Sequence, residues 1–466
     1  MPESKIADDA SLQLSVRAAG ISFGDLPPAA VTAAKWGILD TLGVCLAATG
    51  SASEYIDPAR RFVANSGSEG PVPAPTLGQR VSLFDAILWV GSLAHALDFD
   101  DVAGYSHPSA PVVCAALPLA NWRKGIDGKR LITAVALGQD LVIRLAQATR
   151  RPMSAYGWLP SMPGTMGAAL TAAKLLSLSA EQTRSSLGLA LHQTSGTMQA
   201  LTGPGSAYRA IREGMNARAG VLSALLALEG MPGDDLSLEG QYGYFPQFFG
   251  SDYEASFIRS RELMGSLISF KPWPCAGHPQ LFLTALSDLM SEGKVRPGEI
   301  RTIRITGCSD LLAHQCAPLE TRSAPKYSID AKISIPFLIG KLLRHGTLTI
   351  RDFSAEGLDD PAASELGARV EWRVEPTFAR GPNGYGLGRV EIEHNDGTTV
   401  VAETEYPLGH PDRPLTWDQI ADKFRACVAS SSLKIPDAAD EIIAMVDSLE
   451  FVPDAGQIIE KAFEGV

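Results

Sequence analysis

Acidic and imidazole side chains gather in residues 91–111, which read GSLAHALDFDDVAGYSHPSAP. A mostly apolar run, Phe84–Leu97, leads directly into three carboxylates, and a histidine followed by a proline comes after them. The ionisable residues of this stretch are His95, Asp98, Asp100, Asp101 and His107. Because ionisable groups are costly to desolvate at the end of a buried segment, the pattern indicates side chains that face a cleft. A histidine that changes charge near neutral pH, with carboxylates beside it, suits acid–base chemistry.

The spacing within this stretch leaves three interpretations open. His95, Asp98 and Asp101 are each three residues apart, so a helix continuing through them would place them on neighbouring faces. If the loop then folds back, Asp98 and His107 form an acid–base pair. The second interpretation is a solvated helix end with an aspartate that caps the next element. The third is a hard cation held by carboxylates and a histidine, but no ligand spacing is diagnostic, so we expect no metal site.

Two cationic segments further along the chain are candidates for the same site. Arg209 and Arg212 stand where a helix is expected to start and could form a fork for carboxylates, with a solvated arginine face as the alternative. Lys271 and His278 flank a Pro-Trp-Pro loop, whose prolines stiffen it for a site that must hold its position. A domain hinge is the alternative there. Tyr327 is a weaker candidate.

Composition excludes several classes of partner. The formal net charge of the 466 residues is -12, which argues against nucleic acid and anionic membranes, because phosphates demand a basic footprint. The six cysteines are scattered without a Cys-x-x-Cys pair, so we expect no zinc or iron–sulfur site. No signal-peptide pattern opens the chain, and no stretch approaches the roughly 18 apolar residues that span a bilayer. We therefore expect a cytoplasmic protein.

Hydrophobic spacing predicts a mainly α protein with two domains, since 466 residues exceed one ordinary core. Residues 1–268 are predicted to form a large all-helical domain, rich in small side chains that let helices approach closely. Its expected helices are Val31–Ala48, Leu131–Thr149, Gly164–Leu178, Ser185–Ala200 and Met215–Leu228. Residues 406–466 return to amphipathic helix and are expected to join this domain.

Residues 269–405 are predicted to form a smaller α+β lid domain. Its expected helices are Gln280–Ser291 and Ser334–Arg344, and its expected strands are Ile300–Thr306, Val370–Val374, Val390–His394 and Thr398–Glu405. The Asp396-Gly397 pair between the last two strands is a strong hairpin signal. The glycine-rich run 381–388 leads into a strand and lacks the strand–glycine–helix order of a dinucleotide site, so we expect no cofactor site there.

Several of these segments together resemble the MmgE/PrpD family. The matching segments are Ile38–Val44, Ala94–Asp101, His107–Ser109, Gly164–Leu178, Gly220–Gly230 and Lys271–Cys275. The His-Ala-x-Asp-Phe-Asp-Asp run with a later His-Pro-Ser is specific, and the ordered series is more so. The family includes 2-methylcitrate dehydratases, cis-aconitate decarboxylases and iminodisuccinate epimerases.

The resemblance implies a helical domain, an α+β lid and an active site between them. It also implies a homodimer that needs no cofactor and acts on small polycarboxylates at carbon next to a carboxylate. Asp98, His107 and Lys271 match positions that the family uses in its site, and Tyr327 matches a further one. The expected catalytic residues are Asp98, His107 and Lys271, and the expected substrate-binding residues are Arg209, Arg212, His278 and Tyr327.

Three positions depart from the family pattern. Leu159 replaces the histidine of a Gly-Phe-His-Pro motif, Arg209 replaces a lysine, and Arg212 replaces a histidine. Losing histidine and gaining arginine removes proton-transfer capacity and adds grip on carboxylates. Eliminating water needs a base and an acid, whereas epimerisation needs only proton removal and return. The departures therefore favour epimerisation of a polycarboxylate. The chain also most resembles the iminodisuccinate epimerase branch, whose substrate joins two succinate units through one nitrogen and carries four carboxylates.

We therefore predict a cofactor-independent epimerase. Asp98 or His107 removes the proton next to a carboxylate, a second group returns one on the opposite face, and Lys271 or the arginines stabilise the intermediate. Lys271 is itself a candidate second base if burial lowers its pKa. The alternatives are a 2-methylcitrate dehydratase and a polycarboxylate-binding protein that has lost catalysis, which the missing histidine would explain.

Overall fold

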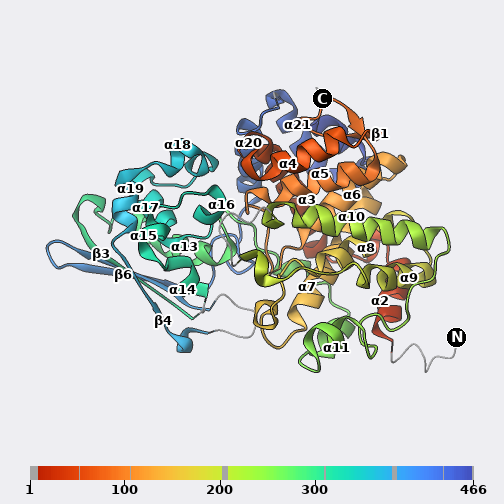
Figure 1. Ribbon diagram of the computed structural model, residues 1–466, viewed down its shortest axis with the longest axis horizontal. Helices are drawn as coiled ribbons and strands as arrows, with labels where there is room; N and C mark the ends of the chain where they lie inside the picture. Colours follow the sequence, from red (N-terminus) through yellow and green to blue (C-terminus); the bar gives the residue numbers. More distant parts are fainter. Residues whose placement is uncertain are drawn as a thin grey trace.

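Two hydrophobic cores organise the chain, one among helices and one between helices and a sheet. The computed structural model describes residues 9–463 except Ala52, Tyr105, 202–207, 309–310, 380–385 and Lys434, so most of the glycine-rich run lies outside the described residues. Figure 1 shows the helical part on the right and the sheet on the left. This arrangement confirms the predicted fold class, mainly α with a smaller α+β part.

The larger part is a bundle of helices. Its elements are α2 (Ala10–Gly20), α3 (Pro28–Ser51), α4 (Ser53–Asn65), β1 (Glu69–Pro73), β2 (Arg80–Val81), α5 (Leu83–Ala96), α6 (Ser109–Arg123), α7 (Gly128–Gln147), α8 (Gly164–Leu175), α9 (Ala180–Leu191), α10 (Tyr208–Leu228), α11 (Tyr244–Phe249) and α12 (Ala255–Arg259). Helices α5 and α10 approach closely because Gly91 faces Gly214, where a Cβ on Gly91 would lie 2.3 Å from the Cα of Gly214. That close packing brings the C-terminal end of α5 to the first turns of α10.

Helix α3 is long and apolar enough to cross a membrane by length and composition, contrary to the expectation from the sequence. However, 72% of its most apolar window is buried inside the protein. It packs against α5, α6 and α7 on the one hand and against the C-terminal helix α20 (Trp417–Ala429) on the other. A helix surrounded by other helices is apolar on every face, which accounts for its composition.

One predicted helix in this part is wrong in its bounds. Residues 185–200 do not form a single helix, because α9 already begins at Ala180 and ends at Leu191. Ser179 and Gln182 form a capping box that sets the start of α9. After the helix, Gly196 adopts a φ of 137°, which a continuing helix does not allow.

The smaller part is a four-stranded sheet with helices on one face. Its elements are α13 (Gly277–Ser291), β3 (Ile300–Gly307), α14 (Leu311–Cys316), α15 (Leu319–Ser323), α16 (Ser328–Ala331), α17 (Ile335–His345), α18 (Ala355–Leu358), α19 (Pro361–Gly367), β4 (Val370–Val374), β5 (Gly388–His394) and β6 (Thr399–Thr404). The strand order is β4-β3-β5-β6, with β3 parallel to β4 and the other pairs antiparallel. The predicted hairpin is confirmed, and Gly397 occupies its turn with a φ of 82°.

The C-terminal helices return to the helical part (Figure 1). They are α20, α21 (Pro436–Asp447) and α22 (Gln457–Ala462), and their apolar residues belong to the helical core. Helix α20 packs on α3, where Lys423 lies 2.6 Å from the buried carboxylate of Asp40. The two parts of the molecule are therefore not consecutive in the chain, because the α+β part is inserted between helices that share one core.

Candidate active site

The acidic stretch leaves the helix instead of continuing it. Helix α5 ends at Ala96, and Asp98 adopts a left-handed conformation with a φ of 50°. The chain turns there, so the helix does not continue, and His95, Asp98 and Asp101 do not occupy neighbouring faces of one helix. The turn instead sends successive carboxylates in different directions, and each of them finds a different partner.

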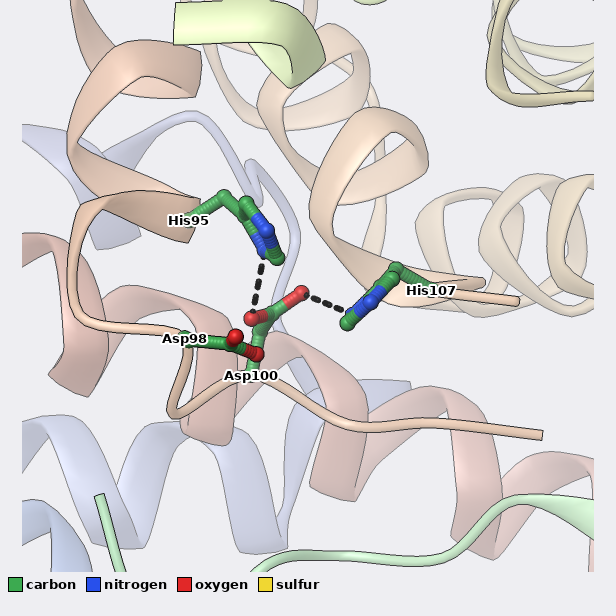
Figure 2. Close-up of side chains that lie close together, drawn as sticks. All are labelled: His95, Asp98, Asp100 and His107. Carbon is green, nitrogen blue, oxygen red and sulfur yellow. Dashed lines mark hydrogen bonds and ion pairs between the residues drawn. The ribbon is translucent and has the colours of Figure 1, made fainter. Parts of the chain in front are cut away.

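Asp100 lies between two imidazoles (Figure 2). Its two carboxylate oxygens are 2.8 Å from Nδ1 of His95 and 3.0 Å from Nδ1 of His107, and the ring centroids are 4.5 Å apart. An ionised carboxylate only accepts hydrogen bonds, so each Nδ1–H donates one to it. This leaves Nε2 as the ring nitrogen not engaged by Asp100, and a single carboxylate orients both rings.

The pKa values in this cluster follow from burial and from these partners. Burial raises the pKa of Asp100, but His95 and His107 outweigh it and hold the pKa well below its ordinary value. Burial lowers the pKa of His95 to about 3, and the guanidinium of Arg212 adds to the effect. Asp100 is therefore ionised and His95 neutral at neutral pH.

Asp98 forms an ion pair with Lys271. The ammonium of Lys271 donates to Oδ1 of Asp98 at 2.8 Å and to its backbone carbonyl at 2.8 Å. Burial raises the pKa of Asp98, but Lys271 and the nearby histidines overcome it and lower that pKa below its ordinary value. Burial likewise lowers the pKa of Lys271, yet Asp98 and Asp100 overcome it and raise the pKa. Lys271 was a candidate base only if its pKa were lowered, and that is not the case. The pair therefore consists of an ammonium and a carboxylate.

A cavity of about 140 Å³ brings most of the predicted site residues together. It lies between the two parts of the molecule, with α5 and α10 on one side and α13 and α14 on the other. Its ionisable and polar lining residues are His95, Asp98, His107, Arg209, Arg212, His278, His314 and Gln315. Lys271 reaches this cavity through its bond to Asp98. Segments from both parts of the chain therefore share one hollow, as a common active site requires.

The two arginines differ in how firmly they are held. Arg212 is 5% exposed and its Nε donates to Glu213 at 3.0 Å. Arg209 is 7% exposed, but its nearest carboxylate, on Asp330, is 3.9 Å away, and it donates to the carbonyl of Ile329 at 3.4 Å. The alternative of a solvated arginine face is wrong for both residues. Of the two arginines, Arg209 has the longer ion pair with a carboxylate.

His278 and Tyr327 lie in different surroundings. His278 is buried in the first turn of α13, where its Nδ1 lies 2.5 Å from Oε1 of Gln315 and burial lowers its pKa. Tyr327 is 47% exposed and lines a neighbouring hollow, so the structure does not place it in the 140 Å³ cavity.

Asp101 has a separate, structural environment. Its carboxylate accepts from the backbone N–H of Ser109 at 3.1 Å and from the Ser109 hydroxyl, at the start of α6. Burial raises the pKa of Asp101 to about 8, and the nearby carboxylate of Asp40 adds to the shift. The interpretation of an aspartate that caps the next element is therefore right for Asp101, although the site is buried and not solvated.

The cluster also has the composition of a metal site. One ligand atom from each of His95, Asp98, Asp100 and His107 lies within 4.8 Å of the others. Two imidazoles and two carboxylates suit a transition-metal ion. Lys271, however, already supplies a positive charge at Asp98, and both oxygens of Asp100 accept from imidazoles. A divalent cation would have to displace these contacts, so a site that works without metal stays our prediction.

Comparison with known proteins identifies the family. Residues 12–256 match the MmgE/PrpD N-terminal domain, and residues 273–450 match the MmgE/PrpD C-terminal domain. The chain belongs to the MmgE/PrpD family. It is 25% identical over 472 residues to the cis-aconitate decarboxylase of Aspergillus terreus, which covers 95% of this chain and 94% of the relative. It is also 25% identical over 459 residues to the cis-aconitate decarboxylase of Homo sapiens, covering 93% of this chain and 90% of the relative.

Within this MmgE/PrpD chain, several residues at the cavity were not among the predicted site residues. His95, His314 and Gln315 line the cavity, and Asp100 and Glu213 form hydrogen bonds with the lining residues His95 and Arg212. His95 and Asp100 had a signal, because they belong to the same acidic stretch. Glu213 had a weaker one, as an acid next to an arginine. His314 and Gln315 had none, since only the tertiary structure brings α14 to the cavity.

Proposed function

We propose that this protein is a cofactor-independent isomerase that removes and returns the proton at carbon next to a carboxylate of a small polycarboxylate such as iminodisuccinate. The observation that carries the proposal is the shared cavity, which is lined by His107 and Arg209 and adjoins the Lys271 ammonium. Removing such a proton requires a positioned base and positive charge where the enolate-like intermediate forms. The cavity contains both.

His107 is the proposed proton acceptor. Its Nδ1 is engaged by Asp100, which leaves Nε2 to take the substrate proton, and the ionised carboxylate then stabilises the imidazolium. Lys271 is the proposed donor on the opposite face, because it starts as an ammonium. Asp98 holds that ammonium in place. In the reverse direction the two groups exchange roles, as epimerisation requires.

The departures from the family pattern favour epimerisation. Leu159, which stands in place of the family's histidine, is fully buried and apolar, so that position supplies no proton-transfer group. Arg212 lies beside His95 and contributes charge in place of a titratable ring. The remaining groups suit a substrate with several carboxylates.

Decarboxylation of cis-aconitate is a second candidate, because relatives that carry this name align with nearly the whole chain. It would use the same cavity, since loss of carbon dioxide also leaves negative charge that must be stabilised and protonated. The 2-methylcitrate dehydratase and non-catalytic alternatives remain as further outcomes of the test.

The test compares the candidate substrates with purified protein. Stereopure (S,S)- or (R,R)-iminodisuccinate in heavy water is expected to incorporate deuterium next to the carboxylate and to lose optical activity. Release of labelled carbon dioxide from cis-aconitate would instead support the decarboxylase, and alkene absorbance from 2-methylcitrate the dehydratase. Tight binding of these compounds without turnover would support the binding protein. Absence of deuterium incorporation would contradict the epimerase.

We further propose that the protein works in the cytoplasm as a homodimer without cofactor. The family resemblance supports the dimer, and the buried thiols of Cys45, Cys114, Cys275, Cys316 and Cys427 suit a reducing compartment. Light scattering coupled to gel filtration is expected to give twice the mass of one chain, and a monomeric mass would contradict the proposal.

A further inference from the structure

A second hollow of about 390 Å³ adjoins the 140 Å³ cavity described above, which we call the catalytic cavity. We call the second hollow the outer hollow, and its ionisable lining residues are Arg209, His314, Glu320, Arg322, Lys326, Tyr327 and Asp330. Arg209, His314, Leu201 and Ile333 line both spaces. The two spaces are therefore neighbours that share four lining residues.

Arg209 is the strongest indication of what the outer hollow binds. Its side chain is 9% exposed, and the closest approach to a carboxylate is 3.9 Å, to Asp330. Removing a guanidinium from water is costly unless a negative charge compensates it closely. Among the described residues, this shared arginine has a long ion pair with Asp330 and one carbonyl contact at 3.4 Å, and the carboxylate of Asp98 acts on it from the catalytic cavity. An anionic group of a ligand at this junction would complete its compensation.

The outer wall adds further positive charge. Arg322 is half-buried and donates to the carbonyl of Ala317 at 3.4 Å, and Lys326 is exposed at the rim. Burial lowers the pKa of His314, and the guanidinium groups of Arg322 and Arg209 lower it further, as expected in a positive potential. The hollow thus has three cations against two carboxylates, in a protein with a net charge of -12. Such a local reversal of charge favours an anionic ligand.

The volumes of the two spaces also indicate that a ligand extends from the catalytic cavity into the outer hollow. Pockets for small molecules usually measure about 300–1,000 Å³. The catalytic cavity, at about 140 Å³, is below that range, whereas the outer hollow, at about 390 Å³, is within it. A substrate with two carboxylate-bearing arms would use both.

We propose that the outer hollow binds the second arm of a two-armed polycarboxylate, with Arg209 at the junction and Arg322 and Lys326 holding the distal carboxylates. The inference rests on the proposed function and deepens it, because it selects substrates with two dicarboxylate arms over substrates with one. The arm that reacts lies beside His107, and the arm that does not react supplies binding energy and specificity.

The experiment compares two substrates in variants of the outer hollow. Deuterium exchange is measured for iminodisuccinate, which has two arms, and for N-methylaspartate, which has one. In Arg322→Gln the ratio of kcat/KM for iminodisuccinate to that for N-methylaspartate is expected to fall about tenfold or more, because a charge-assisted contact is lost from one substrate only. Lys326→Gln is the second variant, which keeps the test possible if Arg322→Gln does not fold. Lys326 is exposed, and its replacement is expected to lower the same ratio.

Arg344→Gln is the matched control, because it removes the same charge from an exposed position in α17 that lines neither space. An unchanged ratio in both outer-hollow variants, or an equal change in the control, would overturn the inference while leaving the exchange reaction established. If neither substrate exchanges deuterium, the proposed function fails, and calorimetric binding then decides on the outer hollow. Wild-type protein should bind iminodisuccinate at least about tenfold more tightly than succinate, and Arg322→Gln should abolish that difference. Equal affinities in wild-type protein would overturn the inference.

Discussion

Asp100 and Asp101 are consecutive and equally buried, yet their pKa values move in opposite directions. Burial raises the pKa of both. For Asp100 the two imidazoles overcome this effect, whereas Asp101 has only the hydroxyl and N–H of Ser109, and the carboxylate of Asp40 opposes its ionisation. The comparison shows that the partners of a carboxylate, and not its burial, decide whether it serves as a charged group of the active site or as a structural cap.

The largest expected effect is the loss of Asp100. Asparagine has one carbonyl oxygen, so Asp100→Asn cannot accept from both Nδ1 atoms, and at least one imidazole changes its tautomer. The rate of deuterium exchange is expected to fall about a thousandfold. Asp101→Asn is the matched control and should lose less than about tenfold, since Asp101 is bound by Ser109 and does not line the cavity. Similar losses in the two variants would remove the distinction between them.

Removal of Lys271 tests the second ion pair of the site. Lys271→Met leaves the carboxylate of Asp98 without its partner in a nearly buried position. The free energy of unfolding, measured with urea, is expected to fall by about 3–5 kcal/mol. The double variant Lys271→Met with Asp98→Asn should recover part of the loss, because no unpaired charge remains. No recovery would mean that packing, and not charge, explains the effect.

Loss of the proposed base gives the next effect. His107→Gln should lower the exchange rate at least about a hundredfold, because the amide cannot accept the proton. Asp98→Asn should lower it by a similar factor by releasing Lys271. Circular dichroism establishes whether each variant is folded. Near-normal rates in folded His107→Gln would show that another group is the base.

The raised pKa of Asp101 predicts a pH-dependent stability. In the unfolded chain its pKa is about 3.9, and in the folded protein it is about 8, so the folded state binds the extra proton. Its contribution to stability is complete below pH 4 and is lost as pH rises towards 8, by up to about 1.4 kcal/mol per pH unit. The difference in unfolding free energy between wild-type protein and Asp101→Asn should follow this trend. A difference independent of pH would show that Asp101 is already ionised in the folded state.

The smallest expected effect concerns metal. Since Lys271 and the two imidazoles already compensate Asp98 and Asp100, dialysis against a chelator is expected to leave the exchange rate within about twofold. Loss of activity that a divalent cation restores would show that the cluster of His95, Asp98, Asp100 and His107 holds an ion in the working enzyme.

Local signals in the sequence were sufficient for much of the fold. Turn chemistry at Asp396-Gly397 predicted the hairpin because a two-residue turn depends on its own residues. The alternation of apolar and polar side chains predicted β3 and β5, because this pattern is also a property of the segment itself. The bounds of α9 were wrong because hydrophobic spacing alone missed the capping box at Ser179 and the break near Gly196. The ordered motifs of the chain were also sufficient to indicate the family.

The sequence by itself determined which residue types are available for chemistry, including Asp98, His107 and Lys271. Only the tertiary structure decided their partners. Lys271 is 173 positions from Asp98, and the direction of each carboxylate depends on the left-handed turn after α5 and on the contact of that loop with α6. Because a pKa depends on atoms within a few ångströms, the same aspartate can be a charged partner or a protonated cap. That choice is made by folding, which brings distant charges together and excludes water from them.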